Sequence, residues 1–192
     1  MKICLVMGTR PNFMKIAALL GPIKNSSIES IVVHTGQHYD DNMSKSILSD
    51  LSFNKINYHI KLSSNGSINQ FANIMTEFEN ICRIEKPDIV VVPGDVNSSL
   101  ACALVASKLD IRIAHLEAGL RSFDRAMPEE INRILTDQLS DYLFITEESA
   151  KINLINEGID KEKIIFSGNT MIDTLSKNIS KAKSLKVCEK YR

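Results

Sequence analysis

The sequence predicts an α/β fold with a doubly wound parallel sheet and helices on both of its faces. Short runs rich in Val and Ile alternate with longer segments of helical period along the whole chain. Several runs are continuously apolar, such as IVVV at 89–92, which is typical of parallel strands buried on both faces. Parallel strands need crossover connections, and the helical segments supply them. No repeat or Pro/Gly-rich linker interrupts the alternation, so we expect one domain.

Seven runs are expected to be strands. Most are rich in branched apolar residues, and polar or glycine-containing segments follow them, as at strand ends. In chain order the runs are 2–7, 30–34, 57–61, 88–92, 111–115, 142–145 and 163–166.

Two helices are predicted most clearly. Apolar residues recur at three- and four-residue steps over 67–84, and Ser67 with Gln70 predicts a capping box at the start. The same period continues over 130–139, and Pro128 suits the first turn of that helix.

Composition excludes several classes of function. The 192 residues are 44% hydrophobic and 24% charged, and 23 Lys and Arg balance 23 Asp and Glu. Zero net charge and a pI near 6.9 give no basic surface for nucleic acid or an anionic membrane. No apolar run approaches the ~20 residues that span a bilayer. The apolar run at the start of the chain is too short for a secretory signal. We therefore expect a soluble, cytoplasmic protein that binds neither nucleic acid nor membrane.

The cysteines predict buried, reduced thiols. Cys4, Cys82 and Cys102 lie in apolar periodic segments, Cys188 lies near the end, and no C-x-x-C is present. The histidines show neither H-E-x-x-H nor a cysteine partner at ligand spacing, so no metal site is expected.

Functional residues are expected just after the strands, because open α/β sheets bind ligands outside the carboxyl ends of their strands. After the first strand, Gly8 and Pro11 flank a turn into a helix, where free backbone N–H groups and the helix dipole favour an anion. Arg10 adds a charge suited to phosphate, although it could also be an ordinary surface arginine. The chain lacks G-x-G-x-x-G, G-x-S-x-G and the P-loop pattern, which argues against a dinucleotide site, a hydrolase elbow and a P-loop.

Asp95 is the first acidic candidate. It follows the strand at 88–92, after a tight turn at Gly94 and before a helix opened by Asn97 or Ser98. Asp95 could therefore be catalytic, or it could be a cap or first-turn residue of that helix.

Glu117 is the second acidic candidate, after the strand at 111–115. If the strand continues, alternation places Glu117 on the same side as His115. An unpaired carboxylate at the end of a buried strand is costly, so Glu117 needs a function or a partner, and Arg121 or Arg125 could be that partner.

Glu129 is the third acidic candidate, although the helix dipole alone favours an acid in a first turn. If the loop 121–127 folds over the sheet edge, Glu129 would approach Asp95 and Glu117. Three carboxylates beside Arg10 would combine proton-transfer groups with an anion anchor.

Taken together, these segments resemble the non-hydrolysing UDP-N-acetylglucosamine 2-epimerases. Five strings carry the resemblance, in the family's order and at nearly its spacing, up to about residue 177. They are GTRPNFMKIA at 8–17, TGQHYD at 35–40, GDVNSSLACAL at 94–104, HLEAGLRSFDRAMPEEINR at 115–133 and SGNTMIDTL at 167–175.

The resemblance implies a Rossmann-like domain that forms one half of a glycosyltransferase-B-type two-domain fold. Members interconvert UDP-GlcNAc and UDP-ManNAc, for cell-envelope polysaccharide biosynthesis, without a cofactor. A base removes the proton on C2 of the sugar, and UDP leaves C1 to give 2-acetamidoglucal. UDP then re-adds after protonation from the other face.

The resemblance also assigns roles to single residues, and leaves open which acid serves which face of the sugar. It implies that Arg10 binds the UDP diphosphate, that Asp95, Glu117 and Glu129 are the catalytic acids, and that Gln37 and His38 help to bind a second, activating UDP-GlcNAc.

Family members are roughly twice as long as this chain, as two domains require. The resemblance therefore implies an N-terminal domain at 1–177, a Lys-rich tail or helix at 178–192, and no C-terminal UDP-binding domain within these residues. A separately encoded C-terminal half could complete the cleft, and we expect a homo-oligomer, a dimer. Two alternatives stay open: a non-catalytic nucleotide-sugar-binding or regulatory module, and a hydrolysing or other UDP-sugar 2-epimerase.

Overall fold

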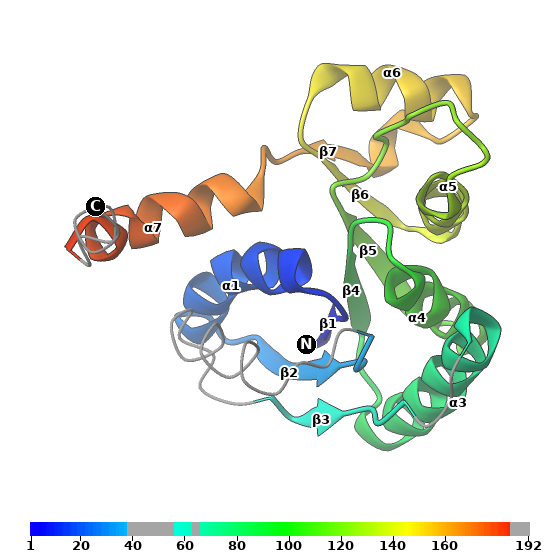
Figure 1. Cartoon of the computed structure of the whole chain (residues 1–192), viewed down its shortest axis with the longest axis horizontal. Coiled ribbons are helices and arrows are strands. Elements are labelled where there is room, and N and C mark those ends of the chain that lie inside the picture. The colour runs from blue at the N-terminus through cyan, green and yellow to red at the C-terminus, as the bar shows by residue number, and fades with distance from the viewer. Residues whose placement is uncertain (38–55, 63–65, 185–192) are drawn as a thin grey trace.

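The computed structural model describes residues 1–37, 56–62 and 66–184. It contains a seven-stranded sheet with every neighbouring pair parallel, in the order β3-β2-β1-β4-β5-β6-β7 (Figure 1). The doubly wound parallel sheet predicted from the sequence is thus confirmed. The strands are β1 (Lys2–Met7), β2 (Glu29–His34), β3 (Tyr58–His59), β4 (Ile89–Pro93), β5 (Arg112–Leu116), β6 (Tyr142–Ile145) and β7 (Ile164–Phe166).

Helices connect the strands and cover both faces of the sheet. Figure 1 shows α1 and α7 on one side of the sheet and α3, α4 and α5 on the other. The helices are α1 (Arg10–Lys24), α3 (Ser67–Glu85), α4 (Asn97–Lys108), α5 (Pro128–Leu139), α6 (Glu148–Asn156) and α7 (Thr170–Ser184), with a 3-10 turn at Lys161–Lys163.

The core lies in two layers because successive side chains of a strand point to opposite faces. Leu5 of β1 packs with Phe13 and the rest of the apolar side of α1. The next residue, Val6, packs on the opposite face with Ile74 and Phe78 of α3. The continuously apolar strands therefore fill both layers, as the sequence predicted.

The observed strands agree with the predicted runs to within one residue at each end, except at 57–61, where β3 is Tyr58–His59. β3 is the edge strand and pairs only with β2. Oδ1 of Asn57 accepts the N–H of Val32 at 3.0 Å and the N–H of Asn57 donates to the carbonyl oxygen of Val32 at 2.9 Å, so a side-chain oxygen replaces the backbone acceptor just before β3.

The capping box predicted at Ser67 and Gln70 is wrong. Gly66 is the N-cap of α3, with φ +114°, and Ser67 is already the first helical residue. The hydroxyl of Ser67 instead accepts a hydrogen bond at 3.3 Å from the side-chain amide of Asn97 at the start of α4.

The C-terminal segment is helical as far as it is described. α7 packs on α1, where Thr174 donates to the carbonyl oxygen of Met14 at 2.7 Å and Lys177 donates to that of Ala18 at 3.4 Å. The domain boundary expected after residue 177 falls within this helix and stays a prediction.

The cysteine prediction is confirmed where it can be examined. Cys4, Cys82 and Cys102 are free and buried, and Cys188 lies outside the described residues. Across the described ranges, none of the helices is both long and apolar enough to cross a bilayer.

Candidate active site at the switch point of the sheet

The strand order reverses between β1 and β4, and ligands bind at such switch points in open α/β sheets. The chain leaves β1 through Gly8 into α1, and it leaves β4 through Gly94 toward α4. Glu117 follows the next strand along, β5. The segments that carry Arg10, Asp95 and Glu117 therefore begin at the same edge of the sheet.

The turn after β1 differs from the prediction, because its first backbone N–H groups are already occupied. Oδ1 of Asn12 accepts hydrogen bonds from the N–H of Gly8 at 3.1 Å and of Thr9 at 3.0 Å. Its Nδ2 donates to the carbonyl oxygen of Pro93 at 3.2 Å, so Asn12 also joins α1 to the end of β4. Arg10 is exposed in the first position of α1, and an anion here would be held by its side chain and the helix dipole.

Asp95 is not a helix cap. The N-cap of α4 is Val96, and the Asp95 carboxylate forms an ion pair with Arg133 of α5. The side-chain amide of Asn132 donates to the Asp95 carbonyl oxygen at 2.9 Å. Two neighbouring residues of α5 thus hold both the backbone and the side chain of Asp95.

Glu117 lies beyond the end of its strand, because β5 ends at Leu116. Glu117 adopts a left-handed conformation with φ +69°, so the strand alternation that would align it with His115 does not extend to it. Its partner is neither Arg121 nor Arg125, as the sequence suggested, but Lys15 of α1.

Lys15, like Arg133, is a residue of this site that sequence reasoning missed. It is buried, 9% exposed, and its ammonium group faces the carboxylate of Glu117. Burial lowers the pKa of Lys15, the negative charge of Asp95 opposes this, and the positive charge of Arg133 adds to it. A lysine on the apolar side of α1, between Phe13 and Ala18, was the available signal.

The ammonium group of Lys15 and the carboxylate of Glu117 lie close to Gly94, which has φ +65°. A Cβ at this position would lie 2.9 Å from Nζ of Lys15 and 3.9 Å from Oε2 of Glu117. The site therefore requires a residue without a side chain at 94. Glu117 thus lies beside Gly94, the residue before Asp95, and each of the two acids is paired with a cation.

Glu129 is exposed in the first turn of α5, and no bond from it to Asp95 or Glu117 is found in the part of the chain that the structure describes. Its neighbour Glu130 is buried and accepts the backbone N–H groups of Ser122 at 3.0 Å and Phe123 at 2.9 Å. Burial would raise the pKa of Glu130, but these hydrogen bonds bring it below its ordinary value. Glu130 thus fixes the loop that precedes α5, and the role of Glu129 stays a prediction.

Gln37 also lies at the carboxyl edge of the sheet. Its Oε1 accepts hydrogen bonds from the backbone N–H of Ser98 at 3.1 Å and from its hydroxyl at 2.7 Å, at the start of α4. His38 lies outside the described residues.

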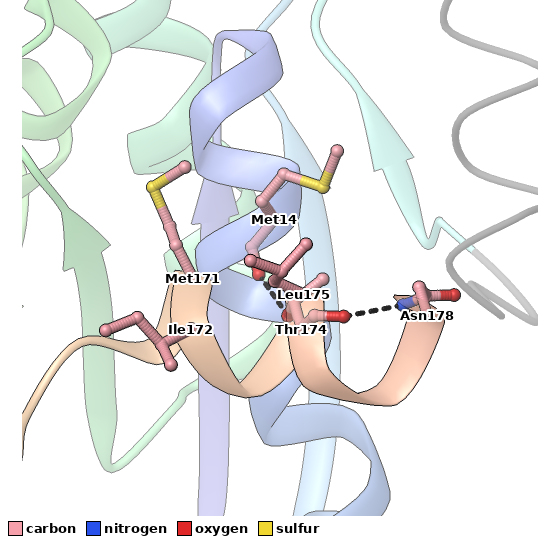
Figure 2. A pocket seen from close by; sticks show the side chains of 6 residues that line it. All are labelled: Met14, Met171, Ile172, Thr174, Leu175 and Asn178. Carbon is pink, nitrogen blue, oxygen red and sulfur yellow. Dashed lines mark hydrogen bonds between the residues drawn. The ribbon is translucent and has the colours of Figure 1, made fainter. Parts of the chain in front are cut away.

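A pocket of about 360 Å³ lies between α1 and α7 (Figure 2). Its lining is largely apolar and includes none of the predicted site residues; it consists of Met14, Met171, Ile172, Thr174, Leu175 and Asn178. Within the described ranges, no group of three or more His, Cys, Asp and Glu residues could hold a metal ion.

The fold is that of an α/β domain with charged residues at the switch point of a parallel sheet, the place where open α/β sheets bind their ligands. A family model described as UDP-N-acetylglucosamine 2-epimerase matches residues 23–191, and the chain belongs to this family. Its sheet is that of one half of a glycosyltransferase-B-type epimerase.

Two relatives and one crystal structure illustrate the similarity. A UDP-N-acetylglucosamine 2-epimerase of Methanocaldococcus jannaschii is 45% identical over 190 residues, which are 99% of this chain and 50% of the relative. A crystal structure of the M. jannaschii UDP-GlcNAc 2-epimerase in complex with UDP-GlcNAc and UDP superposes with a TM-score of 0.95 at 43% identity, covering 100% of this chain and 53% of that one. A UDP-2,3-diacetamido-2,3-dideoxy-D-glucuronate 2-epimerase of Pseudomonas aeruginosa is 45% identical over 177 residues, which are 91% of this chain and 50% of the relative. The chain therefore spans about half the length of the relatives that it matches.

Proposed function

We propose that this chain is the half of a UDP-GlcNAc 2-epimerase that carries the catalytic acids. The observation that carries the proposal is the position of Asp95 and Glu117 beside Gly94 at the switch point, each paired with a cation from a helix. Family membership supplies the class of substrate.

The reaction needs a base for the C2 proton, an acid that returns a proton from the other face, and positive charge for the departing diphosphate. Asp95 and Glu117 are the groups proposed for proton transfer, with Glu129 as the third acid. Arg10, exposed at the start of α1, is proposed to bind the diphosphate of UDP. Elimination and re-addition of UDP change no net oxidation state, so the reaction requires no redox cofactor.

The proposed reaction also needs a second wall for the cleft. This chain matches about half of its relatives' length, and both reactants must be held in a fixed geometry for efficient turnover. We propose that a C-terminal half, in the same or a separate polypeptide, supplies most of the uridine contacts, and that the complete protein forms a dimer.

The test is an assay of UDP-GlcNAc in D₂O with the chain alone and with an added C-terminal half from a relative. We expect little turnover by the chain alone. With the added half, we expect UDP-ManNAc and deuterium at C2, and loss of both with Glu117→Gln. Full activity of the chain alone would disprove the need for a second half. A stable complex of the halves that binds UDP-GlcNAc but exchanges no proton would favour the non-catalytic binding module.

A second candidate is a 2-epimerase for another UDP-sugar. The relative from P. aeruginosa acts, by its name, on a 2,3-diacetamido glucuronate, and it is as similar to this chain as the M. jannaschii epimerase is. Competition between the two UDP-sugars in the same assay distinguishes the substrates through kcat/KM. Release of free ManNAc and UDP, instead of UDP-ManNAc, would indicate a hydrolysing epimerase.

A further inference from the structure

A buried ionic network connects the two loops that carry Asp95 and Glu117. His115 of β5 and Asp137 of α5 are both fully buried, and Nδ1 of the histidine lies 2.6 Å from Oδ1 of the aspartate. Nε2 of His115 donates to the carbonyl oxygen of Gly94 at 2.8 Å, because a carbonyl oxygen can only accept.

The second carboxylate oxygen of Asp137 holds the other loop. It accepts the backbone N–H of Gly119 at 3.1 Å and lies 2.7 Å from the guanidinium of Arg121, which also pairs with Glu157. Burial would raise the pKa of Asp137, but the charges and hydrogen bonds of His115 and Arg121 bring it below its ordinary value. Asp137 is therefore an ionised acceptor that is satisfied on both oxygens.

These bonds end next to the two acids. The carbonyl group of Gly94 belongs to the planar peptide that joins Gly94 to Asp95. The bond from His115 therefore fixes the orientation of this peptide, and with it the position of the Asp95 backbone nitrogen. Gly119 lies in the same turn as Glu117, two residues further on, and is held by Asp137.

Stability alone does not explain this network. The desolvation of a buried ion pair offsets much of its attraction, and well-packed apolar residues of similar size are often equally stable. The side chains of His115 and Asp137 are also closed off from the surface, at 0% exposed, so neither can touch a substrate. Their effect on a ligand must pass through the loops that they hold.

We propose that His115 and Asp137 are positioning residues, which set the mutual position of Asp95 and Glu117 by holding the Gly94–Asp95 peptide and the Gly119 turn. The consequence for catalysis rests on the proposed function, whereas the consequence for the two loops does not.

Two substitutions of the histidine separate its two bonds. His115→Asn places an amide nitrogen near the position of Nδ1, which keeps the contact with Asp137 and loses the bond to Gly94. His115→Gln places its nitrogen near the position of Nε2 and does the reverse. The matched control is Asp141→Asn, because Asp141 accepts the N–H of Ile113 at 2.9 Å at the opposite end of the same strand.

The first measurement is hydrogen exchange of the whole chain without ligand, with circular dichroism to show that each variant is folded. The reporters are the N–H of Gly94, which donates to Leu116, and the N–H of Gly119. With His115→Asn we expect about tenfold faster exchange at Gly94 and little change at Gly119, and with His115→Gln the reverse. The control should alter neither.

Equal changes at both amides, or none, would overturn the proposal. If neither His115 variant folds, Asp137→Ala decides the question, because it removes both acceptor oxygens, whereas an amide at 137 could still accept the N–H of Gly119. Unchanged exchange at Gly119 in that variant would then count against the proposal.

The second measurement is C2 proton exchange of UDP-GlcNAc with the C-terminal half added. His115→Asn should lower kcat roughly 100-fold with little change in KM, because small misplacements of reacting groups have effects of this size. Asp141→Asn should leave kcat unchanged. If the unsubstituted chain exchanges no proton, the proposed function fails, and the amide pattern still decides whether the network positions the loops. An unchanged kcat in a variant with the altered amide pattern would disprove the catalytic consequence.

Discussion

The ammonium group of Lys15 lies against the carboxylate of Glu117 and joins helix α1 to the turn after strand β5. The side chain of Lys15 is 11% exposed and that of Glu117 is 21% exposed. Because water solvates neither charge fully, each charge is stabilised by the other. A second ion pair, between Arg133 and Asp95, lies close enough for its charges to act on Lys15. The switch point of the sheet thus holds alternating acids and cations that come from four segments of the chain.

Replacement of Lys15 by Met should therefore leave Glu117 partly buried without a cation. We expect a loss of about 2 kcal/mol in the free energy of unfolding, measured with urea at neutral pH. In the complemented enzyme, we expect a roughly 100-fold fall in the rate of C2 exchange. Lys24→Met is the control, because Lys24 is exposed in the last turn of the same helix. Equal stability of the two variants would mean that the pair does not support the fold.

Two glycine substitutions should differ in their effects. Gly94→Ala requires φ +65° with a Cβ that lies 2.9 Å from Nζ of Lys15, and we expect a loss of about 2 kcal/mol in the free energy of unfolding. Gly21→Ala in α1 meets no atom within 4 Å apart from its chain neighbours, but Pro22 follows it and disfavours a helical residue with a Cβ, which offsets the gain in helix propensity, so we expect a change below about 0.5 kcal/mol. The midpoints of urea unfolding measure both changes. A stabilising Gly94→Ala would contradict the crowding at this site.

His34 should make the protein sensitive to acid. The residue is buried at the end of β2, where its Nδ1 accepts the N–H of Gly36 at 3.1 Å, and a proton on Nδ1 would end that bond. Burial, with a smaller effect of His59, lowers the pKa of His34 from 6.5 to about 4. As pH falls through 6.5, the unfolded chain takes up the proton before the folded one. The stabilisation present above pH 6.5 is therefore lost between pH 6.5 and pH 4, by about 2 kcal/mol at pH 5.

The measurement is the free energy of unfolding at pH 7 and pH 5. His34→Asn provides an oxygen for the N–H of Gly36 but does not titrate, so its stability should fall less over this range than that of the unsubstituted chain. His59→Asn should also reduce the pH dependence, by less than His34→Asn, because His59 lies with its ring centroid 5.4 Å from that of His34 and helps to lower its pKa. A pH dependence that persists unchanged in His34→Asn would rule out His34 as its source.

The buried cysteines should be inert in the folded protein. Burial raises the pKa of the Cys82 thiol to about 12, and it raises the pKa of Cys4 and Cys102 well above the ordinary value. Because the thiolate is the reactive form, none of the three should react with a thiol reagent at pH 8 until urea unfolds the chain. Cys188→Ser removes the remaining cysteine from the assay. Rapid labelling of the folded variant would show that one of these thiols is accessible.

Much of the fold could be predicted from the sequence, because the spacing of apolar residues that distinguishes a strand from a helix is visible within a few neighbouring residues. The run at 89–92 is apolar at every position, which only a strand covered on both faces explains well, and β4 lies in the middle of the sheet. The weakest prediction was at 57–61, where an edge strand pairs on one side only. The capping box failed because Ser67 has a partner in another helix, Asn97, which no local pattern reveals.

The sequence by itself determined which residues follow the strands, and hence that Asp95 and Glu117 would reach one edge of the sheet. Only the tertiary structure decided their partners. Lys15 and Arg133 are distant in the chain from the acids they neutralise, and a charge distant in sequence leaves no mark on local periodicity. The left-handed turn at Glu117, which directs it toward α1, likewise depends on bonds that its backbone makes with β6. Periodicity records which face of an element is buried, whereas the pairing of charges depends on which faces meet after folding.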